Sequence, residues 1–164
     1  MSPLDELPSF KLAPELSGLQ LLEQWIAHGY VSGLNGTLKV RPVEARAGFV
    51  RFHCAIGPEH SNFVGLVHGG ATAALVDIAG GAAAMSLLNP GETLLTVDLN
   101  ARYISSITIG TQSVFAEATV TYSDARRIIC EVKIVAENAD AVLGSVSISR
   151  RPSAASCHLR VAKE

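Results

Sequence analysis

The sequence predicts an α+β domain in which a curved antiparallel sheet of five or six strands wraps around one long apolar helix. Between residues 95 and 148, four segments alternate apolar and polar residues, as strands with one buried face do. Upstream of them, residues 71–88 contain a single charged side chain, that of Asp77, which is typical of a helix surrounded by protein. The turns between the four segments are short and suit antiparallel hairpins, because parallel strands need long crossover connections.

The composition predicts one domain that associates with copies of itself. The chain has 164 residues, which is close to the length of one domain. Apolar residues make up 48% of it and charged residues only 17%, so a monomer would lack polar residues to cover its surface, and we expect a homo-oligomer. The formal net charge of -2 excludes the basic footprint of a nucleic-acid-binding protein and favours a small-molecule partner.

The chain divides into an N-terminal region (residues 1–35), a main domain (36–151) and a C-terminal tail (152–164). The N-terminal region combines an irregular lead-in with an amphipathic helix that should end near Gly29. The apolar residues of that helix recur at spacings of three and four and are Leu16, Leu19, Leu22, Trp25 and Ile26. The tail lacks hydrophobic periodicity, and we expect it to be a frayed terminus.

The strand signals begin with a hairpin of residues 37–45 and 48–56, which ends at the Gly-Pro of residues 57 and 58. The four later segments each place a row of apolar residues on one face, and Thr96 falls on the opposite, polar face. These rows are Leu95, Val97, Leu99, Ala101 and Tyr103; Val114, Ala116, Ala118, Val120 and Tyr122; Ile128, Cys130, Val132, Ile134 and Ala136; and Val142, Val146 and Ile148. Turns are expected at residues 123–125 and 138–140.

The long apolar helix should begin at the His-Gly-Gly of residues 68–70 and end at the Asn-Pro-Gly of residues 89–91. Its interior carries Gly80 and Gly81, each of which lowers helix stability by about 1 kcal/mol relative to alanine. We expect this loss to be offset by close packing of the helix on the sheet. A membrane span is rejected, because the Asp77 carboxylate would cost about 2.5 to 3.5 kcal/mol at the centre of a bilayer.

The cysteines and the N-terminus predict a cytoplasmic protein. Cys54, Cys130 and Cys157 are odd in number and far apart, so they form neither a disulfide framework nor a metal motif, and we expect reduced thiols. The histidines lack a close ligand pair, and no metal is expected. The first residues are acidic and lack the basic-then-apolar order of a secretory signal.

Four elements of the sequence form a recognisable pattern, namely Asn62, His68-Gly69-Gly70, Asp77 and Thr96. This pattern resembles that of the PaaI-type acyl-CoA thioesterases, which have the hot-dog fold. In that family an asparagine precedes a His-Gly-Gly, an aspartate follows nine residues after the histidine, and a serine or threonine opens the next strand. The similarity runs from about residue 36 to residue 150, and it includes the Val-Asp-Leu-Asn of residues 97–100.

The resemblance implies hydrolysis of an acyl-CoA to a free acid and CoA, with CoA as part of the substrate and without a separate cofactor. By the same resemblance, the Gly69 N–H is the principal donor to the thioester carbonyl, and Asn62 reinforces it or orients water. His68 holds the turn, and Thr96 holds the attacking water. Asp77 acts as a general base or as a nucleophile that forms an anhydride, and the sequence leaves both routes open.

The physical chemistry of these residue types agrees with that assignment. A helix N-terminus offers unpaired backbone N–H groups where negative charge develops on a carbonyl oxygen. Gly69 and Gly70 lack side chains, so a substrate can approach their backbone closely. Asp77 is the one charged group of an otherwise apolar helix, and such a group is a candidate catalytic residue.

A distance along the helix predicts the assembly. Gly69 and Asp77 are eight residues apart, which separates them by about 12 Å along the helix axis, too far for both to reach one carbon atom. Two antiparallel helices related by a two-fold axis would bring Gly69 of one subunit to Asp77 of the other. We therefore expect a homodimer, with a dimer of dimers as the larger assembly.

Two questions stay open at the level of sequence. Arg126 and Arg127 lie at a hairpin tip, where they either bind the CoA phosphates or are simply solvated, and the same holds for Arg102, Arg150 and Arg151. The alternative functions are a hot-dog hydratase or dehydratase and a non-enzymatic acyl-CoA-binding module. The sequence lacks the Asp-x-Asn-Pro-x-His of one hydratase branch, the Gly-x-Ser-x-Gly of serine hydrolases and a phosphate-binding loop.

Overall fold

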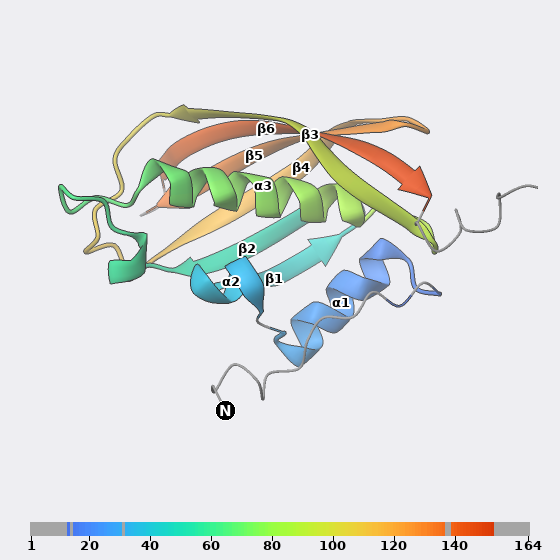
Figure 1. Ribbon diagram of the computed structural model, residues 1–164, viewed down its shortest axis with the longest axis horizontal. Coiled ribbons are helices and arrows are strands. Elements are labelled where there is room, and N and C mark those ends of the chain that lie inside the picture. Colours follow the sequence, from blue (N-terminus) through green and yellow to red (C-terminus); the bar gives the residue numbers. More distant parts are fainter. Residues whose placement is uncertain (1–12, 14, 31, 137–138, 153–164) are drawn as a thin grey trace, which may run out of the picture.

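In the computed structural model, which describes residues 13, 15–30, 32–136 and 139–152, one curved antiparallel sheet packs against a long central helix (Figure 1). The helices are α1 (Gly18–His28), α2 (Gly33–Thr37), the 3-10 helix η2 (Pro58–His60) and α3 (Gly69–Met85). The strands are β1 (Val40–Arg46), β2 (Phe49–Ala55), β3 (Glu92–Tyr103), β4 (Ser113–Ser123), β5 (Arg127–Ala136) and β6 (Ala139–Pro152). The six strands lie in the order β1-β2-β4-β5-β6-β3, which confirms the predicted fold class.

Helix α1 has the boundaries that its capping residues dictate. Ser17 and Gln20 form a capping box, and Gly29 ends the helix in the left-handed conformation with φ of 63°. The predicted end near Gly29 is therefore confirmed. The Gly18 N–H donates to the carbonyl oxygen of Leu88 at 3.0 Å, so the start of α1 is fastened to the segment that follows α3.

The short helix α2 is a feature that the sequence analysis missed. Its five residues, Gly-Leu-Asn-Gly-Thr, show no helical period and resemble a turn. The predicted first strand starts late as a consequence, at Val40 instead of residue 37. Strand β2 alternates as expected, with Val50, Phe52 and Cys54 buried.

Helix α3 lies so close to the sheet that two glycines are needed at the contact. A Cβ atom on Gly80 would lie 2.7 Å from Cγ2 of Val146, and one on Gly144 of β6 would lie 2.6 Å from Cγ1 of Val76. The close approach predicted for the glycine pair is thus confirmed at Gly80. A Cβ atom on Gly81, in contrast, would meet no other atom within 4 Å. Within the described part of the chain, no helix is long and apolar enough to cross a membrane.

Strand β3 contains a bulge that overturns one prediction. Thr96 pairs with Ile148 and Leu99 pairs with Val146, two buried residues of β6, so an extra residue lies between the two pairs. Residues directly opposite each other share a face of the sheet, so Thr96 and Leu99 both face the helix. The predicted single row from Leu95 to Tyr103, with Thr96 on the polar face, is therefore wrong. Leu95 is 52% exposed, because the extra residue reverses the alternation.

The other strands keep most of their predicted apolar rows. Buried positions are Val114, Ala116 and Ala118 of β4; Ile128, Cys130, Val132 and Ile134 of β5; and Val142, Val146 and Ile148 of β6. A second bulge, between Val120 and Tyr122, takes Tyr122 off the predicted face and leaves it 50% exposed. It pairs there with Ile129.

The two described cysteines are free and buried. Burial raises the pKa of both the Cys54 and the Cys130 thiol to about 12, so neither ionises near neutral pH. Several predictions concern residues that lie outside the described ones. These residues are nearly all of the lead-in, residue 138 of the last predicted turn, and the tail after residue 152 with Cys157.

Candidate active site

The first turn of α3 leaves one backbone donor available. His68 is the N-cap, and its ring Nδ1 accepts the Gly70 N–H at 2.8 Å. The His68 carbonyl oxygen accepts the N–H groups of Ala71 and Thr72. Among the residues that the structure describes, no acceptor lies within hydrogen-bonding distance of the Gly69 N–H. Of the two glycines, Gly69 is therefore the one with a donor to offer.

Tyr103 covers the other side of Gly69. Its hydroxyl donates to the Gly69 carbonyl oxygen at 2.9 Å, and a Cβ atom on Gly69 would lie 3.3 Å from the tyrosine oxygen. Gly69 and Tyr103 line a surface depression of about 310 Å³ together with Thr72 and Ile104. The sequence analysis placed Tyr103 in an apolar row of its strand and did not predict this contact, which joins residues 34 positions apart and leaves no local signal.

Asn62 organises the loop that leads to the helix. Its side-chain oxygen accepts the N–H groups of Val64 and Leu66, each at 3.0 Å. Its backbone N–H donates to the Leu66 carbonyl oxygen at 2.8 Å. Because the oxygen is used within the loop, the side-chain NH2 group is the part of Asn62 that is left to meet a substrate or a water molecule.

His60 fixes the base of the same loop and is a residue that the sequence analysis did not assign. It is buried, and its Nε2 lies 2.9 Å from the Leu38 carbonyl oxygen while its Nδ1 accepts the Gly57 N–H at 3.1 Å. Its own carbonyl oxygen accepts the His68 N–H at 2.7 Å. His60 thus holds the helix N-terminus against the end of β2. In the described ranges, no three His, Cys, Asp or Glu residues lie together as a metal site.

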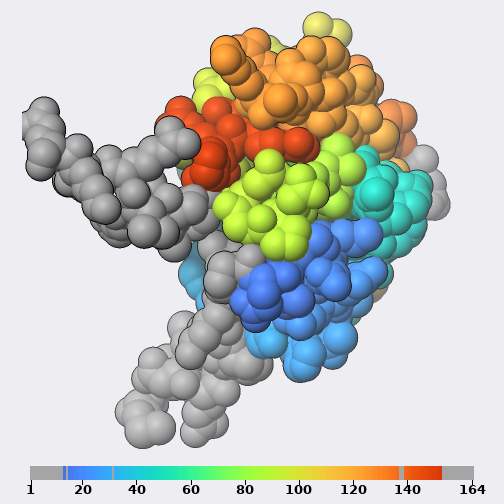
Figure 2. Space-filling model, turned by 90° about the vertical axis from the view of Figure 1, so that its right-hand side faces the viewer, coloured from blue at the N-terminus to red at the C-terminus, as the bar shows by residue number. Residues whose placement is uncertain are grey.

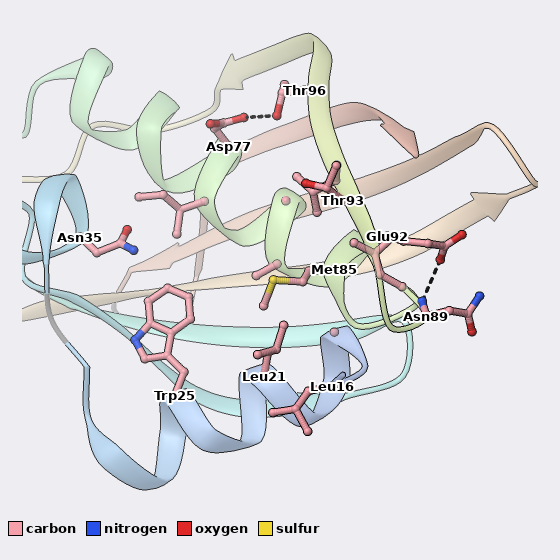
Figure 3. A pocket seen from close by; sticks show the side chains of 16 residues that line it. Leu16, Leu21, Trp25, Asn35, Asp77, Met85, Asn89, Glu92, Thr93 and Thr96 are labelled. Atoms are coloured by element: carbon pink, nitrogen blue, oxygen red, sulfur yellow. Dashed lines mark hydrogen bonds between the residues drawn. The ribbon is translucent and has the colours of Figure 1, made fainter. Parts of the chain in front are cut away.

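The structure brings Asp77 and Thr96 together. The Thr96 hydroxyl donates to Oδ1 of Asp77 at 2.9 Å, and both side chains are half-buried (Figure 3). The contact exists because the bulge in β3 turns Thr96 toward α3. A carboxylate bonded to a hydroxyl in this way keeps acceptor capacity for a water molecule, and the hydroxyl oxygen keeps its lone pairs.

Asp77 and Thr96 lie at one side of a pocket of about 360 Å³ between α1, α3 and the start of β3. Figure 3 shows Leu16, Leu21 and Trp25 of the N-terminal region on the opposite side, with Met85 between the two sides. The remaining lining residues are Gly18, Asn35, Ile78, Gly81, Ala82, Leu88, Asn89, Glu92, Thr93 and Leu94. The walls are mostly apolar, and the charged groups among these residues are the carboxylates of Asp77 and Glu92.

The predicted site residues therefore fall into two groups within one chain. Gly69 lines the depression beside Tyr103, whereas Asp77 and Thr96 line the pocket beside α1, and the two cavities share no residue. Eight residues of helix separate Gly69 from Asp77, about 12 Å. A single chain does not bring the amide donor and the carboxylate to one point.

Arg126 and Arg127 lie at the turn between β4 and β5. Oδ1 of Asp124 accepts both of their backbone N–H groups at 2.7 Å, so the turn is ordered and the two side chains are exposed. The Arg126 carbonyl oxygen accepts the N–H of Arg150 at 2.9 Å, and Arg151 follows on β6. Figure 2 shows this turn (orange) and the end of β6 (red) beside the chain around the end of α3 (yellow-green). None of these arginines lines the pocket.

The fold defined by these elements is the hot-dog fold, as comparison with solved structures shows. A thioesterase from Haemophilus influenzae is 20% identical, with 87% of this chain and 96% of that chain covered and a TM-score of 0.72. A thioesterase family protein from Silicibacter pomeroyi is 16% identical, with 84% and 100% covered and a TM-score of 0.73. Zebrafish thioesterase superfamily member 2 is 25% identical, with 82% and 98% covered and a TM-score of 0.69.

The sequence adds a family match to this fold. Residues 64–142 match the model of the thioesterase superfamily, a stretch that contains His68, Gly69, Asp77, Thr96 and Tyr103. No curated protein sequence matches the chain. The family match and the structural similarities support thioester hydrolysis as the general class of reaction. The PaaI-type resemblance within that class stays a prediction.

Proposed function

We propose that the protein hydrolyses acyl-CoA thioesters to a free acid and CoA. The observation that carries the proposal is the Asp77–Thr96 hydrogen bond of 2.9 Å at the side of an apolar pocket. It supplies a base beside room for an acyl group, in a chain with a thioesterase superfamily match. The reaction consumes only water, so the proposal requires no cofactor.

In the proposed reaction, the Gly69 N–H donates to the thioester oxygen on which negative charge develops. Asp77 removes a proton from a water molecule that Thr96 holds, and the water oxygen forms a bond to the thioester carbon. The carbon–sulfur bond then breaks, and the CoA sulfur leaves as a thiolate that takes up a proton from solvent. In the second route the Asp77 carboxylate attacks the carbon itself, and water then opens the anhydride.

The proposed active form is a homodimer in which each site uses both subunits. Two features support it: Gly69 and Asp77 line separate cavities of one chain, and β3 is an edge strand with exposed apolar side chains. An exposed apolar edge strand invites pairing with another chain. If two copies pair about a two-fold axis with their α3 helices antiparallel, Gly69 of each copy faces Asp77 of the other. A dimer of dimers is the proposed larger assembly.

Arg126 and Arg127 are the proposed partners of the CoA phosphates. Support comes from their exposure at an ordered turn and from the nearby Arg150 and Arg151, which together concentrate positive charge at this end of the sheet. The proposed location of the enzyme is the cytoplasm, where acyl-CoA thioesters are present and cysteines stay reduced.

A thiol-release assay over a panel of acyl-CoAs tests the proposed reaction. We expect release of free CoA from at least one saturated acyl-CoA. Crotonyl-CoA belongs in the panel, because a hydratase would add water to its double bond without releasing thiol. Hydration of crotonyl-CoA together with no thiol release from any substrate would contradict the proposal. Binding of acyl-CoA without any turnover would contradict it as well.

A further inference from the structure

We infer that the pocket between α1, α3 and the start of β3 holds the acyl chain of the substrate in an extended form, and that Gly81 sets the length it accepts. The inference rests on the proposed thioesterase function. It adds a substrate class, unbranched apolar acyl groups without a charged end, and a residue that determines specificity.

The first argument is the shape of the pocket. The lining residues of α3 are Asp77, Ile78, Gly81, Ala82 and Met85, which lie on one face of the helix at spacings of three and four. From Asp77 to Met85 this face extends about 12 Å along the helix axis. A pocket that begins at the proposed base and follows the helix over this distance has the length to hold an extended acyl chain.

The second argument is the charge of the pocket. Among the residues that the structure describes, none of the lysines, arginines and histidines lines the pocket, and its polar lining residues are Asn35, Asp77, Asn89, Glu92, Thr93 and Thr96. Glu92 is engaged, because its Oε2 accepts the Asn89 N–H at 2.7 Å. Two carboxylates and no cation disfavour an acyl group that ends in a second carboxylate. The remaining walls are apolar and suit a hydrocarbon chain.

The third argument is the contrast between two neighbouring glycines. Gly80 is required by packing, since a Cβ atom there would lie 2.7 Å from Val146. Packing does not require a glycine at position 81, because a Cβ atom there would meet nothing within 4 Å. Glycine also lowers the stability of a helix relative to alanine. What Gly81 provides is open space in the pocket wall.

Trp25 offers a direct signal for occupancy of the pocket. It is the only tryptophan of the chain, and it lines the pocket. Its indole Nε1 donates to the Tyr30 carbonyl oxygen at 2.6 Å, and its ring packs edge-on against Phe52 with centroids 5.6 Å apart. A ring fixed in this way should change its fluorescence when an acyl chain replaces water beside it.

The test uses saturated fatty acids from butanoate to dodecanoate and follows Trp25 fluorescence in the full-length protein. Affinity should rise about fourfold for each added methylene until the pocket is full. Gly81→Leu should end this rise at a shorter chain, while Gly81→Ala, the matched control, should shift it little. Met85→Ala should extend it to longer chains. Circular dichroism and the oligomeric state of each variant show that it is folded.

Thiol release from acyl-CoAs of the same lengths separates this inference from the proposed function. We expect kcat/KM to follow the same length profile and to shift with the same variants, and glutaryl-CoA to be a poor substrate. If the wild-type protein releases CoA but Gly81→Leu and Met85→Ala leave both profiles unchanged, the inference is wrong and the proposed function stands. If fatty acids bind with the expected length dependence but no acyl-CoA is hydrolysed, the hydrolase proposal is wrong.

Discussion

The two ends of the proposed chemistry are built in different ways. The amide end, at Gly69, is held mainly by contacts between neighbours in the sequence, such as the His68 ring on the Gly70 N–H. The carboxylate end depends on a contact between Asp77 and Thr96, residues 19 positions apart, and on the β3 bulge that turns Thr96 inward. The amide end therefore follows from local sequence, whereas the carboxylate end follows from the register of the sheet.

The largest effect is expected when the carboxylate of Asp77 is removed. Asp77→Asn keeps the size of the side chain and an oxygen for the Thr96 hydroxyl but removes the base and nucleophile. We expect kcat to fall by about 10²- to 10⁴-fold with the fold and oligomeric state unchanged. Steady-state thiol release measures this loss. A variant with near wild-type kcat would show that Asp77 has no role in the reaction.

The next effect breaks the amide end without disturbing its backbone. Gly69→Pro removes the N–H at the first helical position, where proline is tolerated. His68 already has φ of -63° and ψ of 133°, which suits a residue before proline. We expect kcat to fall about 10²- to 10³-fold.

Gly69→Ala is the control for this experiment, because it keeps the N–H and adds one methyl group beside Tyr103. It should retain most of the activity that Gly69→Pro loses. A Gly69→Pro variant with near wild-type kcat would show that the Gly69 N–H takes no part in the reaction.

Mixing the two inactive variants tests whether the two ends come from different subunits. In a dimer of one Asp77→Asn chain and one Gly69→Pro chain, one of the two sites has both groups intact. Random exchange should therefore restore about a quarter of the wild-type activity, far above that of either variant alone. Sites formed within one subunit would give no recovery on mixing, which thiol release after subunit exchange would reveal.

A smaller effect is expected when the Thr96 hydroxyl at the carboxylate end is removed. Thr96→Val removes the hydroxyl that bonds to Asp77 and keeps the shape of the side chain. We expect a loss of about 1 kcal/mol of transition-state stabilisation, or about fivefold in kcat/KM, and Thr96→Ser should restore it. A greater loss in Thr96→Ser than in Thr96→Val would exclude the hydroxyl as the cause.

The smallest effect concerns the long-range support of the amide end. Tyr103→Phe removes the hydrogen bond to the Gly69 carbonyl oxygen, which lies at an exposed position. We expect the free energy of unfolding in urea to fall by about 0.5 kcal/mol, with kcat changed by no more than about twofold. A much larger loss of kcat would mean that Tyr103, and not His68, fixes the amide.

The elements that could be predicted from the sequence are those with a regular hydrophobic period or with local capping and turn residues. The long helix, the buried rows of β5 and the capping glycine at residue 29 belong to this group. The face of Thr96 was predicted wrongly because an inserted residue leaves no mark in an alternating pattern. The contact of Tyr103 with Gly69 and the short helix α2 were missed, since one depends on tertiary packing and the other is too short to show a period.

The bulge in β3 also decides which changes the chain tolerates at this point. Val97, the extra residue, is 53% exposed, so its replacement by another side chain disturbs little. Its deletion would leave a regular ladder, because Thr96 and Leu99 would then be two residues apart, like their partners Ile148 and Val146. Both residues would still face α3. Insertion of one residue in the regular part of the strand is a different event, because the pleat has a period of two and the side chains beyond the insertion would move to the opposite face. A lineage of such proteins can therefore vary or lose residue 97, whereas the lengths of the paired segments on either side of it are constrained.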